Sequence, residues 1–381
     1  MTEVVQATYL KDAFVRDLLF KHYEYLERFV LGVPFPPYEV ELQPSSRCNI
    51  SCRWCMGAVS CSAGGGFLSD NITPSVMAEI VESLLAVEIG GLVIKTFRFA
   101  GFTGEPLVRG DITLSAIETL TSAGRTVGLF TNGTLMSRAT WETLSRMSYV
   151  HVSLDAGRDS YQLLKGGSRK MFDRVLENIE GLRKYRDACA RGVELHVGFV
   201  VCPENIGELS HVIQTARSVG VDSVFVKCDV TGRLGDSVSL VFDTIEAACE
   251  AYNSPEFAVQ AVHSRRDHVA MAAGPCYPKE ACHYQKLFGT IAPDGKMYPC
   301  DYNAMRCGQV IGDARSFALG WVRSHYSGGK KAGPLPCVSA FCPPIASAMN
   351  AFLQNVELAV NWHGSDVVLA CLKGFANGMQ L

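Results

Sequence analysis

The sequence predicts an α/β fold, with a partial (β/α)6 barrel of parallel strands followed by a small cysteine-rich extension and a helical C-terminal tail. Three observations lead to this fold class. Short apolar runs alternate with longer amphipathic runs through residues 39–229, as in strands joined by crossover helices. Cysteines and turn residues punctuate residues 282–344, and helical periodicity returns after residue 345. Six strand–helix units are too few for a closed eight-stranded barrel.

The pattern divides the chain into a helical cap (1–38), the partial barrel (39–232), a connecting segment (233–281), the cysteine-rich region (282–344) and a C-terminal helix (345–381). The expected strands cover 39–44, 92–99, 126–130, 149–154, 193–201 and 223–227. The expected helices cover 74–87, 112–123, 139–147, 172–186 and 206–219. Reactive residues of such sheets lie at the C-terminal ends of the strands.

Composition narrows the class of protein. The 381 residues are 48% hydrophobic and 19% charged, which suits a buried globular core. The net charge is −3 without a basic run, so we expect no nucleic-acid partner. Charged residues interrupt the first 20 positions, and no apolar stretch reaches about 18 residues, so we expect no signal peptide, no membrane span and a cytoplasmic location. In that reducing compartment the 15 cysteines favour metal ligation over disulfides.

Cys48, Cys52 and Cys55 follow the first expected strand in a C-x3-C-x2-C pattern. Three thiolates on one tight loop can reach a single metal centre, and thiolates are the ligands of iron–sulfur clusters. A cluster with three protein ligands keeps one iron open for another molecule, as catalytic metal sites do. The alternatives are a zinc site, which would want two cysteine pairs, or a core without metal. Cys61, six residues on, is expected to be a free thiol.

This loop, with the aromatic Trp54 before its last cysteine, resembles the radical S-adenosylmethionine (SAM) superfamily. The resemblance implies that the three cysteines hold a [4Fe–4S] cluster, that SAM chelates the open iron, and that one electron splits SAM to a 5′-deoxyadenosyl radical. It also implies that Trp54 packs near the adenine. The electron would come from an external reductant such as flavodoxin or ferredoxin.

Further positions resemble the cofactor-binding motifs of that superfamily, and all of them follow expected strands. Gly104-Glu105-Pro106 is similar to a Gly-Gly-Glu-Pro motif that contacts the cofactor's amino group, although Thr103 replaces its first glycine. A glycine permits close backbone approach, and a carboxylate suits an ammonium group. Taken alone, Gly-Glu-Pro is more often a turn. The other positions with implied cofactor contacts are Asn132, Ser153, Asp155 and Val200.

The later cysteines resemble the SPASM and twitch extensions of radical SAM enzymes, which hold auxiliary [4Fe–4S] clusters. Pro293-Asp294-Gly295 predicts a hairpin whose second strand leads to Cys300. The resemblance implies one auxiliary cluster on Cys282, Cys300, Cys337 and Cys342, with Cys276 and Cys307 as possible substitutes. The alternative is a structural zinc ion on the same four thiolates.

The resemblance implies hydrogen-atom abstraction from a substrate at the mouth of the barrel. We expect a small polar molecule of the sugar, aminocyclitol or nucleoside type, from antibiotic biosynthesis, undergoing oxidation (as in a dehydrogenase), epimerisation or decarboxylation. The alternatives are a radical SAM maturase that modifies a peptide or protein, and a non-catalytic iron–sulfur or zinc protein. Lys227, Cys228 and Asp229 end the sixth expected strand, with Asp229 as candidate base and Cys228 as candidate hydrogen donor. Such a Lys–Asp pair is more often structural.

Overall fold

The computed structural model describes residues 9–10, 15–17, 21–55, 71–101, 104–230, 234–272, 282–301, 304, 310–326 and 342–378. In this part of the chain, a ten-stranded sheet has the order β12-β11-β10-β1-β4-β5-β6-β7-β8-β9. The strands are β1 (Glu39–Leu42), β4 (Thr96–Phe99), β5 (Thr126–Thr131), β6 (Tyr149–Ser153), β7 (Glu194–Val201), β8 (Ser223–Cys228), β9 (Ala258–Ala261), β10 (Phe288–Ile291), β11 (Lys296–Tyr298) and β12 (Gly312–Asp313).

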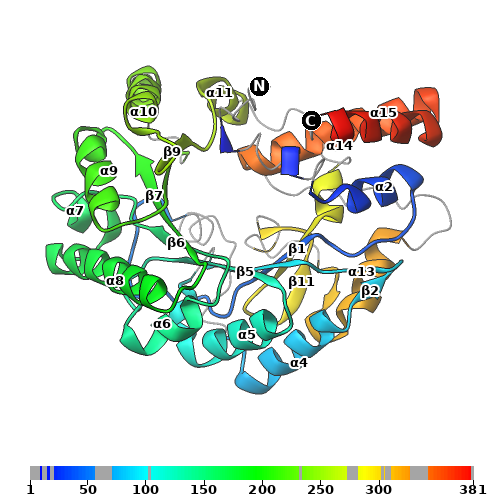
Figure 1. The fold of residues 1–381 in the computed structure, drawn as a ribbon, viewed down its shortest axis with the longest axis horizontal. Coiled ribbons are helices and arrows are strands. Elements are labelled where there is room, and N and C mark those ends of the chain that lie inside the picture. The colour runs from blue at the N-terminus through cyan, green and yellow to red at the C-terminus, as the bar shows by residue number, and fades with distance from the viewer. Residues whose placement is uncertain are drawn as a thin grey trace.

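The strands from β10 through β1 to β9 pair in parallel, and β11 and β12 extend the sheet by antiparallel pairing. Figure 1 shows the sheet curving into an open barrel, so the predicted fold class is confirmed. Five of the six predicted strands are present as single strands. The expected strand 92–99 is divided: β3 (Leu92–Val93) pairs with β2 (Glu88–Ile89) in a separate two-stranded sheet, and β4 joins the barrel. The sequence pattern predicts neither β9 nor the pairing of β10 with β1, because both are four-residue strands outside the regular alternation.

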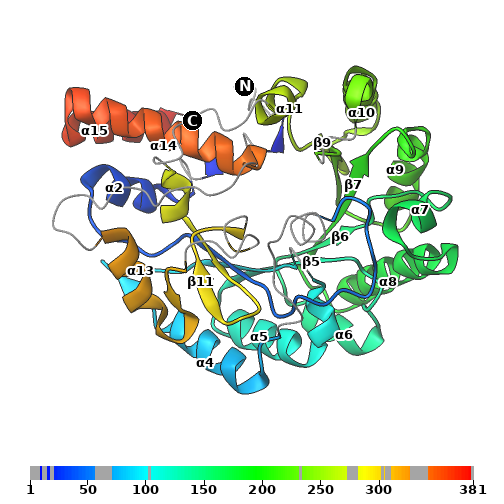
Figure 2. The same cartoon turned by 180° about the vertical axis from the view of Figure 1, so that it is seen from behind.

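Helices cover the outer, convex face of the sheet (Figures 1 and 2). Thr73 caps α4, where its hydroxyl accepts a hydrogen bond from the Val76 amide. The residues of β4 alternate: Phe97 and Phe99 join the core beneath the helices, whereas Thr96 and Arg98 face the barrel interior. The outer helices are α4 (Pro74–Leu85), α5 (Gly110–Ser122), α6 (Arg138–Leu144), α7 (Tyr161–Lys165), α8 (Arg169–Ala188), α9 (Leu209–Ser218) and α10 (Val238–Tyr252).

The predicted hairpin is confirmed, since β10 and β11 pair around Gly295, whose φ of 75° suits a glycine. This hairpin continues the barrel sheet and does not form a separate layer. The remaining helices include α2 (Tyr23–Leu31), α11 (Arg265–Ala272), α13 (Phe317–Tyr326), α14 (Pro344–His363) and α15 (Ser365–Gly378). The expected C-terminal helix is therefore two helices, divided at Gly364, whose φ is 82°.

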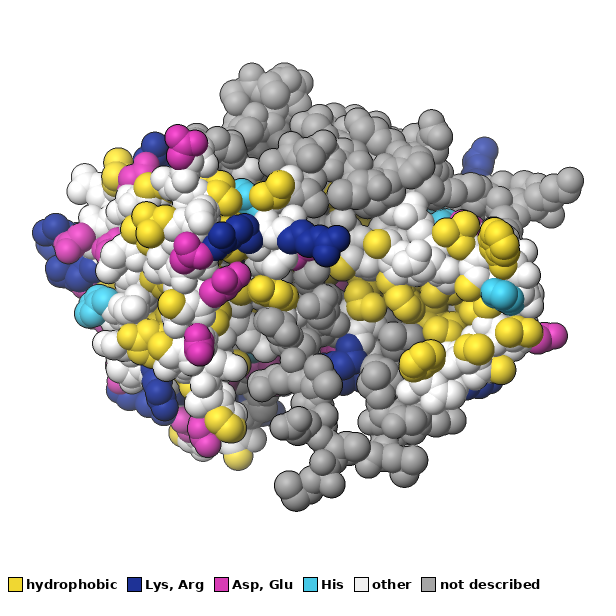
Figure 3. Space-filling model, turned by 90° about the horizontal axis from the view of Figure 1, so that it is seen from above, with side chains coloured by type: hydrophobic (Ala, Val, Ile, Leu, Met, Phe, Trp, Pro, Cys, Tyr) yellow, Lys and Arg dark blue, Asp and Glu magenta, His cyan; other side chains and the backbone are white. Residues whose placement is uncertain are grey.

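Helices α2, α14 and α15 lie together beside the opening of the barrel (Figures 1 and 2). Hydrophobic side chains gather on the right of the view in Figure 3. The exposed large hydrophobic residues of the chain include Leu358 and Trp362 of α14 and Phe375 of α15. Trp362 is 82% exposed. Among the described helices, none combines the length and the apolar character that crossing a membrane requires.

Candidate active site

The cysteine loop leaves the C-terminal end of β1 and is anchored against the end of α7. The amides of Ser51 and Arg53 donate hydrogen bonds to the carbonyl oxygens of Lys165 and Leu164, at 3.2 and 2.8 Å. Burial raises the pKa of Cys48, and it raises the pKa of Cys52 to about 11. The Cys55 thiol adds to both shifts, although the three sulfurs do not all lie within 4.8 Å of one another in this structure.

Gly104 and Glu105 link this loop to the neighbouring strand ends. A Cβ atom on Gly104 would lie 2.2 Å from the Ser45 carbonyl oxygen, so only glycine permits this backbone approach. The Glu105 carboxylate accepts three hydrogen bonds, from the amides of Leu107 and Asn132 and from the Thr131 hydroxyl, at 3.0, 2.7 and 2.7 Å. Burial raises the pKa of Glu105, which these hydrogen bonds partly offset. Its described contacts are therefore structural: it holds the end of β5.

Asn132 connects the end of β5 with the cysteine loop. Its side-chain amide donates to the Asn49 side-chain oxygen at 2.9 Å and lies 3.8 Å from the sulfur of Cys48. Its own oxygen accepts hydrogen bonds from the Thr134 amide and hydroxyl. Asn132 thus fixes the orientation of the first cysteine through contacts that the structure shows directly.

Asp155, after β6, forms a buried ion pair with Lys165 of α7. The ammonium group lies 3.1 Å from the Asp155 carboxylate and donates to the Ser153 carbonyl oxygen at 2.7 Å. Burial alone would lower the pKa of Lys165, but the Asp155 carboxylate and the Cys52 thiol raise it above its ordinary value. Asp155 has a φ of 54°, a conformation that non-glycine residues seldom adopt.

Unpartnered buried polar atoms surround the cysteine loop. The indole nitrogen of Trp54, one carboxylate oxygen of Asp155 and the Tyr161 hydroxyl have no hydrogen-bond partner. Buried polar groups are normally paired, so these atoms fit a site that receives a polar ligand. Val200 is buried at the end of β7, where its carbonyl oxygen accepts a hydrogen bond from Asn205. The predicted cofactor residues therefore occupy adjacent strand ends, and their individual contacts with a cofactor stay a prediction.

Beneath these strand ends, the barrel encloses a cavity of about 460 Å³. Charged side chains line it, among them Arg98 and Glu39. The Arg98 guanidinium contacts the carboxylates of Glu41 at 2.7 Å and of Glu39 at 3.4 Å. Arg98 also lies over the rings of Phe130 and Phe288, at 5.4 and 5.1 Å from their centroids. Burial raises the pKa of Glu39, and the guanidinium opposes that shift.

Histidines line the same cavity. The His151 ring stacks on Phe130 and Phe225, with centroids 4.5 and 5.9 Å apart. Burial and the Lys227 ammonium group hold the pKa of His151 well below 6.5, so the imidazole is neutral at pH 7. His151, His196 and Arg98 are not among the site residues that the sequence predicts. The sequence did contain a signal for them. Strands of a parallel sheet are normally apolar because both faces are buried, yet polar residues stand at alternate positions of these strands.

The three predicted catalytic residues separate at the end of β8. Lys227 lines the cavity, whereas Cys228 points to the opposite face, toward the helices, and is 1% exposed. Asp229 follows the strand and is buried, with its amide bonded to the Val201 carbonyl oxygen at 3.0 Å. Of the three, the geometry brings Lys227 into the cavity, and the catalytic roles stay predictions.

The later cysteines stand on the elements that extend the barrel sheet. Cys282 precedes the turn His283–Lys286, Cys300 follows β11, and Cys342 precedes α14. Cys337, with Cys61, Cys276 and Cys307, lies outside the described residues. The ligand set of an auxiliary cluster therefore stays a prediction.

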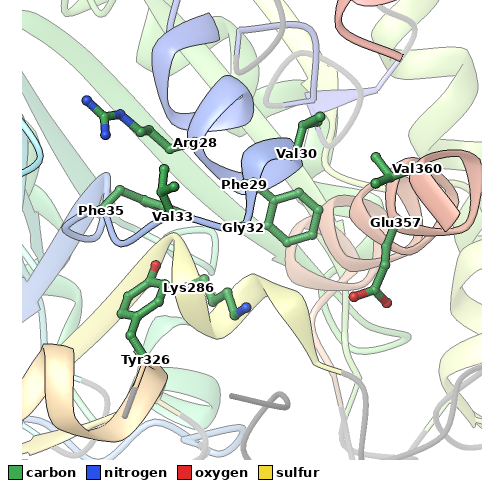
Figure 4. Close-up of a pocket in the computed structure, with 10 residues that line it drawn as sticks. All are labelled: Arg28, Phe29, Val30, Gly32, Val33, Phe35, Lys286, Tyr326, Glu357 and Val360. Carbon is green, nitrogen blue, oxygen red and sulfur yellow. The ribbon is translucent and has the colours of Figure 1, made fainter. Parts of the chain in front are cut away.

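A second cavity lies between α2, α14 and the turn at Lys286 (Figure 4). Its volume is about 20 Å³, room for about one water molecule. Lys286, Glu357 and Tyr326 face it, yet it cannot hold a substrate. The barrel cavity is thus the candidate substrate site in the described part of the chain.

A parallel partial barrel with a three-cysteine loop at the C-terminal end of its first strand fits the class of iron–sulfur enzymes. Comparison with known families agrees: residues 42–216 match the sequence model of the Radical SAM superfamily. The chain therefore carries a radical SAM domain over these residues, and the cofactors of such a domain are a [4Fe–4S] cluster and SAM.

Individual relatives act on different substrates. The PqqA peptide cyclase of Gluconobacter oxydans is 24% identical over 288 residues, covering 71% of this chain and 72% of the cyclase. A probable GTP 3′,8-cyclase of Methanosarcina mazei is 24% identical over 270 residues, covering 67% and 75%.

The solved structures of Streptococcus suis SuiB, bound to SAM or to the precursor peptide SuiA, have TM-scores of 0.56 at 14% and 16% identity. Each match covers 79% of this chain and about two thirds of SuiB, 66% and 67%. At that identity the likeness supports the fold alone.

Proposed function

We propose that this chain is a radical SAM enzyme that modifies a peptide. The observation that carries the proposal is the match to PqqA peptide cyclase, which extends over 288 residues, whereas the superfamily domain is confined to residues 42–216. The likeness therefore reaches beyond the cofactor-binding domain. The fold shared with SuiB, whose structure holds a precursor peptide, is compatible with this proposal. A peptide substrate corresponds to the radical SAM maturase that the sequence offers as an alternative, and not to the small polar molecule expected first.

The residues at the strand ends would hold the cofactors. Cys48, Cys52 and Cys55 would ligate the cluster, which with SAM supplies the radical that abstracts a hydrogen atom. Asn132 would orient Cys48, and Glu105 would keep Asn132 in place through its amide. The Asp155–Lys165 pair would stabilise the α7 end against which the loop is anchored.

The barrel cavity would receive the substrate side chain. Lys227 offers a cation and His151 a neutral imidazole on its wall. The ion pairs of Arg98 with Glu39 and Glu41 supply fixed charges. Such groups orient a polar substrate and exclude bulk water from the reacting position. An auxiliary cluster on Cys282, Cys300, Cys337 and Cys342 would raise the iron content from about four to about eight per chain.

A second candidate is the small polar substrate. The cavity of about 460 Å³ falls within the range of about 300–1,000 Å³ that small-molecule sites occupy. Its charged lining suits a sugar or nucleotide, and the relatedness to a probable GTP 3′,8-cyclase favours the same substrate class.

Deuterium transfer to 5′-deoxyadenosine separates the two candidates. Extract from source cells grown in deuterated medium would be divided into a peptide fraction and a small-metabolite fraction. Each would be incubated anaerobically with SAM, dithionite and the reconstituted enzyme, and deuterium in 5′-deoxyadenosine would be measured by mass spectrometry. We expect transfer from the peptide fraction, and none with the Cys48/Cys52/Cys55→Ala variant. Transfer from the metabolite fraction alone would overturn the peptide proposal in favour of the second candidate.

A further inference from the structure

Cys228, His263 and His268 form a compact group on the helical side of the sheet. The Cys228 sulfur lies 3.3 Å from Nε2 of His263 and 3.0 Å from Nδ1 of His268. All three atoms are within 4.8 Å of one another, which no other trio of Cys, His, Asp or Glu ligand atoms achieves among the described residues. The group therefore has the spacing of ligands around a single ion.

The fold brings these residues together from three elements. β8 and β9 are parallel, with Val226 opposite Ala261, so two residues further along Cys228 and His263 stand opposite each other on one face. His268 comes from α11, whose start is fixed by Ser264, since its amide and hydroxyl donate to the Asp267 carboxylate at 2.9 and 2.6 Å. The positions thus depend on strand register and a capped helix start, and not on a loose loop.

The surroundings separate the group from the barrel cavity. Cys228 and His263 are buried, and the Phe242 ring of α10 packs edge-on against both imidazoles, with centroids 5.8 and 5.5 Å away. Lys227, on the other face of β8, lines the cavity instead. The trio is therefore outside the substrate site, and the residues that hold the cofactors do not contribute to it.

We propose that Cys228, His263 and His268 bind a zinc ion. One thiolate and two imidazoles are ligands that zinc prefers, and three protein ligands leave one position for water. Tetrahedral zinc, with bonds of about 2.3 Å to sulfur and about 2.05 Å to nitrogen, separates sulfur from nitrogen by about 3.6 Å. The observed separations would need to widen by about 0.3 and about 0.6 Å. Binding releases the Cys228 thiol proton to solvent, and no redox step is involved.

The ion would fasten one edge of the sheet, as the described strands define it. β9 is the last strand in the sheet order, with one neighbour, and α11 follows it directly. Zinc would join the end of β8, the end of β9 and α11 at one point, next to Lys227. Because the trio lies outside the substrate site, the role we assign to the ion is to hold the wall of the cavity in place, with its fourth position occupied by water.

Metal content of the intact chain tests the proposal without turnover. Protein purified anaerobically with its iron clusters would be dialysed against zinc, then against a weak chelator, and zinc per chain measured by plasma mass spectrometry. We expect one zinc in wild type and in Cys189→Ser, which changes an exposed cysteine at the end of α8 that is not part of the trio. We expect at least tenfold weaker zinc binding in Cys228→Ser and in His268→Gln.

Cobalt provides a second readout, because a cobalt–thiolate bond gives an intense near-ultraviolet absorption band. This band should form in wild type. In Cys228→Ser its intensity should be lower by the contribution of one thiolate. Equal zinc retention in wild type and folded Cys228→Ser and His268→Gln, or none in wild type, would overturn the proposal. Zinc that survives Cys228→Ser but is lost in Cys300→Ser would overturn it too, since the ion would then belong to the later cysteines. None of these outcomes depends on the substrate class.

Discussion

Asp155 illustrates how single residues fix the geometry of the site. Its left-handed backbone turns the chain at the end of β6, and its carboxylate meets Lys165, which is 1% exposed. A buried charge without a counter-ion is far more costly than a paired one. Lys165 also reaches the Ser153 carbonyl oxygen, and its own carbonyl oxygen receives the Ser51 amide of the cysteine loop. One ion pair therefore supports both a strand end and the metal-binding loop.

We expect Lys165→Met to lower the free energy of unfolding by about 3–5 kcal/mol, because it leaves the Asp155 carboxylate buried and uncompensated. Adding Asp155→Asn should recover part of that loss, since the unpaired charge is removed. The control is Arg158→Met, which breaks the exposed pair with Asp173 and should change little. Anaerobic urea unfolding of the apoprotein measures all three. A loss in Lys165→Met no larger than in Arg158→Met would contradict this prediction.

The sequence predicted that the motif residues lie at strand ends, but it did not predict most of their contacts, and their roles stay predictions. The cysteine spacing, Gly104-Glu105 and Asn132 are local patterns, so their placement at strand ends followed from the strand order. Lys165 was not selected, because its partner lies ten residues away across a turn and its burial has no local signature. The trio with Cys228 joins residues 35 and 40 apart, and only the β8–β9 register reveals it.

At the scale of elements, glycines within strands make room for the large side chains that fill the barrel. A Cβ atom on Gly128 of β5 would lie 2.0 Å from the Tyr149 ring, and one on Gly198 of β7 would lie 2.4 Å from Nε2 of His151. The alternation of small and large inward residues on neighbouring strands lets the side chains interdigitate. These glycines are needed for packing, since neither has a positive φ.

We expect Gly198→Ala to destabilise the fold by about 1–3 kcal/mol, because His151 is held between two aromatic rings and cannot move aside. Gly192→Ala is the matched control: a Cβ atom there meets nothing within 4 Å, so we expect no loss of stability. The double variant Gly198→Ala/His151→Ala removes the clash. Its loss of stability should therefore be smaller than the sum of the losses measured in the two single variants. Urea unfolding checks these values, and additive effects in the double variant would contradict the clash.

The sequence predicted long elements better than short ones. The six alternating strands and their helices follow from periodicity, which survives without tertiary information. β9 has four residues, Ala258–Ala261, within a stretch of helical composition, and tertiary pairing with β8 decides its conformation. The α14–α15 boundary depends on Gly364, and a glycine inside a helical pattern does not by itself end a helix.

At the scale of the whole molecule, residues from the two ends of the chain meet. Trp321 of α13 donates a hydrogen bond to the Phe35 carbonyl oxygen at 3.0 Å, across 286 positions. The His325 ring stacks on Trp321, with centroids 4.1 Å apart, and its Nδ1 pairs with the Trp321 carbonyl oxygen. Burial lowers the pKa of His325 to about 4, so the folded protein keeps this imidazole neutral. Acid should therefore loosen the junction between the two ends.

The direction of this pH effect follows from proton binding. An imidazole exposed by unfolding has a pKa near 6.5, so between about pH 6.5 and 4 the unfolded state binds the proton that folded His325 refuses. The free energy of unfolding then falls as the pH falls, by up to about 1.4 kcal/mol per pH unit from this residue. His325→Gln removes that contribution, so its stability should decline less steeply than that of wild type below pH 6.5. Above about pH 7.5 the two stability curves should run parallel, because the imidazole is neutral in both states. Urea unfolding at half-unit pH intervals measures both curves, and equal slopes below pH 6.5 would show that the folded His325 takes up a proton as readily as the unfolded one.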